Sequence, residues 1–183
     1  MTEYAERYGR VAGAFTERVR AVPAGRWDAP APCEGWVARD VVRHLTEWVP
    51  GFLSSYWELT LPPSPSVDDD PVGAWLALDG AVRSTLDDPS LAASERDSPI
   101  GRSSLEATLD QIVTGDVLIH TWDLARATGL DERLDPDEVH RMLDGIEPMD
   151  EALRSSGHYG PKVAVPDDAG EQDRLLAFLG RQP

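Results

Sequence analysis

Residues 115–129 read GDVLIHTWDLARATG, and this stretch decides the fold because its apolar side chains recur at helical spacing. We expect the helix to begin near Ser103 and Glu106, which have the S-x-x-E spacing of a capping box. Gly129 stands at the C′ position and is expected to end it. At 1.5 Å per residue the helix would be about 37 Å long, which suits one member of a helical bundle.

Three ionisable residues fall on the stripe of this helix that should face a core. The stripe comprises Leu109, Ile112, Val113, Asp116, His120, Asp123, Leu124 and Ala127. An unpaired charge in a bundle core costs several kcal/mol, so these groups must be paired, hydrated or bound to a metal. Asp116 and His120 are four residues apart and therefore share one helical face, whereas Trp122 and Arg126 fit its flanks.

A second predicted helix, residues 37–59, carries His44 on its apolar stripe, between Val41 and Leu45. If the two helices face each other, His44, Asp116 and His120 form a set of two imidazoles and one carboxylate. Three protein ligands leave positions open for water or substrate, as catalytic metal sites do. Imidazole with carboxylate favours Zn²⁺, Ni²⁺ or Fe²⁺ over Mg²⁺ or Ca²⁺.

The same periodicity predicts further helices along the chain. Their ranges are 3–22, 71–87, 135–154 and 171–179. Pro50-Gly51 should kink or break the second helix, and residues 88–103 are expected to form an irregular connector. No series of strands is indicated. The predicted fold is all-α, a four-helix bundle with additional C-terminal helices, in a single domain over residues 1–183.

Composition limits the classes of partner and location. The chain has 33 acidic and 17 basic residues, for a formal charge of −16, which argues against nucleic acid or an anionic membrane as partner. No apolar run approaches the ~18 residues of a membrane span, and the N-terminus lacks a secretory signal. Cys33 is the only cysteine, so no intrachain disulfide forms. We expect a cytoplasmic protein whose oligomeric state is open, a homodimer being one option.

Several residues near the predicted site have two readings. Asp123 either orients the imidazole of His120 from behind or holds Arg126 or a backbone amide. Trp48 either lines a pocket or packs in the core. Cys33 is either a small buried residue or a nucleophile near the metal. His140 lies off the apolar stripe of its helix and is expected to be solvated.

Three segments resemble one known family. Residues 27–45 (WDAPAPCEGWVARDVVRHL) and 115–129 (GDVLIHTWDLARATG) are similar to the two signatures of the mycothiol-dependent maleylpyruvate isomerase metal-binding domain. Residues 165–183 (VPDDAGEQDRLLAFLGRQP) are similar to the C-terminal tail of an uncharacterised actinobacterial branch of that family. The wider group is that of the DinB/YfiT-like metalloenzymes, and the resemblance covers most of the chain.

The resemblance implies a DinB/YfiT-like four-helix bundle that holds a divalent metal, commonly zinc, through His44, Asp116 and His120. It also implies a small-molecule substrate and a low-molecular-weight thiol such as mycothiol, which together point to a thiol S-transferase or an isomerase. The chain departs from the isomerases in three ways. They have Glu where Asp116 stands, many relatives have Ser or Thr where Val37 stands, and the isomerases carry a further C-terminal domain. Only residues 129–183 follow the fourth predicted helix here, which argues against isomerase activity itself.

Three alternatives stay open at this point. With water in place of thiol, the same site would make a metal-dependent hydrolase. A fourth protein ligand would close the site and make a non-enzymatic metal- or small-ligand-binding bundle. His158 is the residue to check for that role, although it is equally compatible with a pocket lip or a plain loop. If the three polar side chains bond only to one another, the chain is a helical interaction module.

Overall fold

The computed structural model describes residues 1–155 and 161–183, which form two compact units, Met1–Asp131 and Glu132–Pro183. Both units are mainly helical, which confirms the all-α class. The single domain expected over residues 1–183 stays a prediction. His158 lies outside the described residues. Within the described ranges, no helix is both long and apolar enough to cross a membrane.

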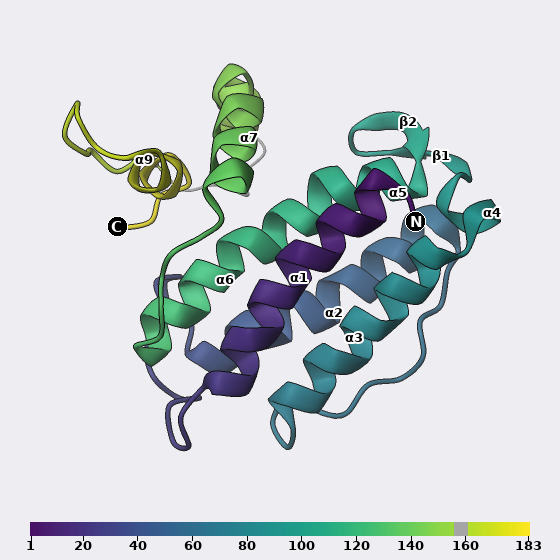
Figure 1. Ribbon diagram of the computed structural model, residues 1–183, viewed down its shortest axis with the longest axis horizontal. Helices are drawn as coiled ribbons and strands as arrows, with labels where there is room; N and C mark the ends of the chain where they lie inside the picture. Colours follow the sequence, from purple (N-terminus) through teal and green to yellow (C-terminus); the bar gives the residue numbers. More distant parts are fainter. Residues whose placement is uncertain (156–160) are drawn as a thin grey trace. The chain divides into compact units, whose positions relative to one another are not determined.

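Four long helices make up the body of the first unit and lie alongside one another (Figure 1). They are α1 (Glu3–Ala21), α2 (Ala38–Trp57), α3 (Pro71–Asp87) and α6 (Gly115–Thr128). Helix α1 packs against α3 and α6, and α2 packs against the same two helices, so the predicted four-helix bundle is confirmed. In its core the buried rings of Phe15 and Trp75 meet edge to face, with their centroids 4.5 Å apart.

Local capping chemistry explains the start of α3 fully and the start of α2 in part. Asp70 accepts a hydrogen bond from the Gly73 backbone N–H at 2.8 Å and so caps α3. At the start of α2 the N-cap residue is Val37, whose side chain has no acceptor. Asp40 Oδ2 accepts from the Val37 N–H at 3.0 Å, so only one half of a capping box is present.

A kink or a break was expected at Pro50-Gly51, and helix α2 runs unbroken from Ala38 to Trp57 with Pro50 inside it, so the break is wrong and the kink stays a prediction. Proline removes one backbone hydrogen bond and crowds the preceding turn. Val49 and Leu53, on either side of Pro50, are fully buried against the bundle. Tertiary packing therefore outweighs the local cost of the proline.

Residues 88–104 are ordered, so the expectation of an irregular connector is wrong. They form the short helix α4 (Pro89–Ala92) and the antiparallel hairpin of β1 (Glu95–Ser98) and β2 (Gly101–Ser104). Both strands are four residues long and mostly exposed, so they lack the apolar alternation that identifies a strand in a sequence. Gly101 has a φ of +92°, a conformation that favours glycine and lets the chain turn back.

The long helix expected over residues 103–128 is continuous but not uniform. It consists of α5 (Leu105–Thr108), a π-helical segment η1 (Leu109–Thr114) and α6. Its N-cap is Ser104, which accepts from the Ala107 N–H at 3.3 Å, and not Ser103. Trp122, expected on a flank, is buried with 1% exposure, because α6 contacts other helices on more than one face.

The second unit is built from shorter helices. They are α7 (Pro136–Ile146), the 3₁₀ turn η2 (Glu147–Met149), α8 (Asp150–Ser155) and α9 (Glu171–Phe178). Helix α7 packs against α9. The single helix expected over residues 135–154 is interrupted at η2, which contains Pro148, a residue without the N–H that an α-helical turn needs.

Candidate metal centre

The loop before α2 is held against α6 although it has little regular structure. The Arg26 guanidinium donates to the Ala127 carbonyl near the end of α6 at 3.1 Å. Within the loop, the Ala31 N–H donates to the Trp36 carbonyl at 2.9 Å, and the Trp36 N–H donates to the Cys33 carbonyl at 3.0 Å. These bonds fold the loop into a tight turn, from which Cys33 and Trp36 reach the polar residues of α6.

The three residues predicted as a ligand set converge. His44 Nε2 of α2 lies 3.1 Å from Asp116 Oδ2, and His120 Nε2 lies 3.4 Å from Asp116 Oδ1. One atom from each residue can be chosen so that all three lie within 4.8 Å of one another. Two ligand atoms at zinc bonding distance in a tetrahedral site are roughly 3.3 Å apart, so the spacing fits one shared ion. Their role as ligands stays a prediction.

The cluster is closed on one side and open on the other. The His120 side chain is 4% exposed, whereas those of His44 and Asp116 are 32% and 29% exposed. Trp36 stacks on His120, with an interplanar angle of 19° and ring centroids 5.8 Å apart. Trp48 donates its indole N–H to Asp116 Oδ2 at 3.0 Å. Trp48 is half-buried and bonds to Asp116, so it contacts the site from α2.

Asp123 fixes the orientation of the deepest ligand candidate. Its Oδ2 lies 2.9 Å from His120 Nδ1, and its side chain has no exposed surface. A carboxylate here holds a proton on Nδ1, so Nε2 is the nitrogen that faces Asp116 and that can bind a metal once its own proton is lost. This contact is the one that the first reading of Asp123 requires, and its role in orienting the imidazole stays a prediction.

Cys33 belongs to a second, overlapping group. Its Sγ donates to Asp123 Oδ2 at 3.6 Å, and Cys33, His120 and Asp123 also lie close enough together to hold an ion. Both groups contain His120, whose Nε2 faces Asp116 of the first group and whose Nδ1 faces Asp123 of the second. These are the two groups of three potential ligands found in the described ranges.

The electrostatics of the cluster favour a cation at its centre. Burial alone would raise the pKa of Asp116, but the adjacent His120 and His44 outweigh it and hold the pKa well below its usual range. Burial would lower the pKa of His120, but Asp116 and Asp123 outweigh it and raise that pKa to about 9. Without a metal the site therefore keeps a proton on His120, which a binding metal has to displace.

Trp36 is the site residue that sequence reasoning missed. It lies in a Pro- and Gly-rich loop outside any helical stripe, so periodicity gives no signal for it. His140 is exposed, as expected, and lies 3.0 Å from Glu171 Oε1.

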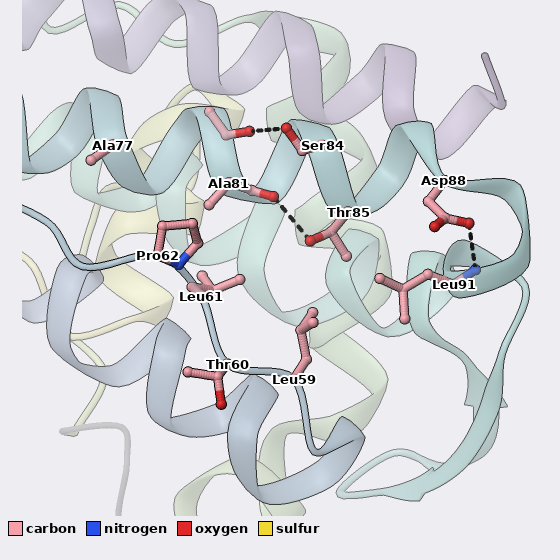
Figure 2. Close-up of a pocket in the computed structure, with 11 residues that line it drawn as sticks. Leu59, Thr60, Leu61, Pro62, Ala77, Ala81, Ser84, Thr85, Asp88 and Leu91 are labelled. Atoms are coloured by element: carbon pink, nitrogen blue, oxygen red, sulfur yellow. Dashed lines mark hydrogen bonds between the residues drawn. The ribbon is translucent and has the colours of Figure 1, made fainter.

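A separate hollow of about 410 Å³ lies between the segment after α2 and one face of α3 (Figure 2). The side chains of Ser84, Thr85 and Asp88, which line it, are bonded within the protein. The Ser84 and Thr85 hydroxyls donate to carbonyls one turn earlier, and Asp88 Oδ1 accepts from the backbone of α4. None of the predicted site residues lines it, and it offers no comparable cluster of ligands.

Comparisons with known proteins point to one family. The family described as "Mycothiol maleylpyruvate isomerase N-terminal domain" matches residues 8–125, a range that includes His44, Asp116, His120 and Asp123. Two uncharacterised proteins of Mycobacterium tuberculosis, from strains CDC 1551 and H37Rv, are each 28% identical to this chain over 177 residues. Each match covers 94% of both sequences. No solved structure matches significantly.

Proposed function

Because the chain belongs to the mycothiol maleylpyruvate isomerase N-terminal domain family, we propose that it is a divalent-metal-dependent enzyme that transfers a low-molecular-weight thiol to a small molecule. The observation that carries the proposal is the meeting of His44, Asp116 and His120 at a site open on one side. Zinc is the proposed metal, with nickel or iron as the other ions suited to these ligands. Mycothiol is the proposed thiol.

Each residue of the site has a role in this proposal. His44, Asp116 and His120 hold the metal, which when bound would lower the pKa of a thiol and keep its sulfur as a thiolate. Asp123 keeps His120 in the tautomer that presents Nε2. The indole of Trp48 neutralises part of the Asp116 charge by donating a hydrogen bond. A cytoplasmic location, where such thiols are kept reduced, is part of the proposal.

A metal-dependent hydrolase is the second candidate. The exposed sides of His44 and Asp116 accommodate water as readily as a thiol, and the donor set does not favour one over the other. Measuring thiol consumption distinguishes the two candidates. The transferase should consume one thiol for each molecule of a small electrophile, whereas the hydrolase should consume none.

Metal analysis of protein purified without a histidine tag tests the site. We expect one equivalent of zinc, nickel or iron per chain, lost in His44→Ala and His120→Ala and retained in His140→Ala. His140 is the matched control because it is exposed and outside the donor set. Absence of metal after reconstitution would remove the enzyme proposal and favour the helical interaction module.

A thermal melt with thiols tests the co-substrate. Mycothiol should raise the melting temperature of the metal-loaded protein and leave that of His120→Ala unchanged, because a ligand stabilises only the state that binds it. A metal-loaded protein that responds to no thiol would favour the hydrolase or the non-enzymatic binding bundle.

A further inference from the structure

The π-helical segment η1 ends two residues before Asp116, and a buried arginine from another helix holds it. Arg7 of α1 is 5% exposed, and its Nη1 donates to the Asp110 carbonyl at 3.0 Å and to Asp110 Oδ1 at 2.8 Å. The Thr114 hydroxyl donates to the Leu109 carbonyl at 3.2 Å, five residues earlier. The first two carbonyls of η1, those of Leu109 and Asp110, thus each accept a hydrogen bond from a side chain.

The π segment changes the angular relation between the residues before it and the ligand candidates of α6. A π turn closes its hydrogen bond one residue later than an α turn and so contains one extra residue. Compared with an unbroken α-helix, side chains after η1 are rotated by about 100°, the angular step of one residue at 3.6 residues per turn. In the structure His44 Nε2 lies 3.1 Å from Asp116 Oδ2, and one ligand atom from each of His44, Asp116 and His120 lies within 4.8 Å of the others. A rotation of α6 by about 100° would turn Asp116 and His120 away from His44.

Stability alone is a weak explanation for the Arg7–Asp110 pair. The two side chains are 6% and 10% exposed, and the desolvation of such a pair offsets much of its attraction. What the pair supplies is geometry, because one guanidinium bonds the backbone and the side chain of the same residue in the π turn. π turns are rare, and they are found frequently at functional sites.

We propose that Arg7 is a positioning residue that, through Asp110 and η1, sets the orientation of Asp116 and His120 toward His44. The inference rests on the proposed metal site for its main readout and has a second readout that needs no metal. Arg7 lies on α1, which contributes no ligand, and the bonds that link it to the ligand-bearing helix end on Asp110 in η1.

Calorimetric zinc titration of Arg7→Met is the first test, with Asp110→Asn as a milder variant should Arg7→Met fail to fold. The matched control is Arg83→Met. Arg83 similarly bonds a carboxylate, Asp79 Oδ1, at 2.9 Å and an α1 carbonyl, that of Gly9, at 3.4 Å, but touches neither η1 nor the donor set. We expect the zinc affinity to fall about tenfold or more in Arg7→Met, less in Asp110→Asn, and to stay near wild type in Arg83→Met. Equal affinities in the Arg7 and Arg83 variants, both folded, would overturn the proposal.

The second readout is the Trp48 indole N–H in the metal-free protein. This group donates to Asp116 Oδ2, so its NMR resonance, assigned with Trp48→Phe, reports the position of Asp116. We expect the resonance to shift in Arg7→Met or Asp110→Asn and to stay in place in Arg83→Met. If the wild type bound no zinc, the proposed function would fail while this comparison still tested the positioning role. If Arg7→Met and Asp110→Asn both fold and the Trp48 resonance is unchanged in both, the positioning role of Arg7 is overturned.

Discussion

The carboxylate of Asp123 lies 2.9 Å from Nδ1 of His120, and neither side chain is appreciably exposed to solvent. Nε2 of the same ring lies 3.4 Å from Asp116 Oδ1 at the mouth of the site. The imidazole is thus held between a buried carboxylate behind it and a half-exposed one in front. An arrangement of this kind fixes both the tautomer and the ring orientation of a metal-binding histidine.

Replacing Asp123 should therefore weaken metal binding without removing a ligand. We expect Asp123→Asn to lower zinc affinity by roughly 10- to 100-fold, measured by competition with a chromophoric chelator. Asp79→Asn is the control, because Asp79 is also a buried carboxylate but is paired with Arg83 on α3. A zinc affinity in Asp123→Asn equal to that of the control would show that Asp123 does not support the site.

The stability of the metal-free protein should fall as the pH rises from 6.5 to 9. The folded-state pKa of His120 is raised from 6.5 to about 9, so its contribution is full below pH 6.5 and is lost as the pH rises through 9. Asp116, whose pKa is lowered, is ionised in both the folded and unfolded states over this range and adds no slope. We expect a loss on the order of 2 kcal/mol by urea unfolding.

The matched variant for this pH profile is His120→Gln, which should have a flatter curve over the same range. The affinity for zinc should instead increase as the pH rises, because the metal has to displace the His120 proton. A wild-type curve as flat as that of His120→Gln would contradict the raised pKa.

Cobalt can show which of the two overlapping groups holds the ion. If the ligands are His44, Asp116 and His120, the cobalt-loaded protein should lack a thiolate-to-metal charge-transfer band, and Cys33→Ser should bind cobalt as the wild type does. A serine hydroxyl can still donate to Asp123, as the Cys33 thiol does at 3.6 Å. A charge-transfer band that disappears in Cys33→Ser would place the metal with Cys33 instead.

The missing half of the α2 cap offers a test of the fold outside the site. Val37→Thr keeps the shape of the side chain and adds an oxygen that can accept from the Asp40 N–H, which completes the capping box. We expect the free energy of unfolding to increase by about 1 kcal/mol in chemical denaturation. Val37→Ala, which adds no acceptor, should give no such increase. A Thr variant no more stable than wild type would mean that the existing bond from Val37 N–H to Asp40 already suffices.

Much of the fold could be predicted because helical periodicity is a local property. The apolar spacing along α1, α2, α3 and α6 can be recognised in the sequence without knowing how the helices are arranged in space. The hairpin of β1 and β2 and the turn at Pro148 escaped prediction because short exposed strands and single turns leave no periodic signal. Of the kink or break expected at Pro50, the break was wrong because the packing of Val49 and Leu53 cannot be seen in the local sequence.

The sequence by itself determined that Asp116, His120 and Asp123 share one helix and that His44 lies on another. Helix formation and the face on which a side chain lies depend on the spacing between residues near one another in the chain. Only the tertiary structure decided that the two helices turn these faces toward each other and that Trp36 and Cys33 join them from a loop. The physical reason is that such contacts depend on the packing of remote segments. The contact between Arg7 and Asp110 of the π turn is of this kind, because the two residues are more than a hundred positions apart in the chain.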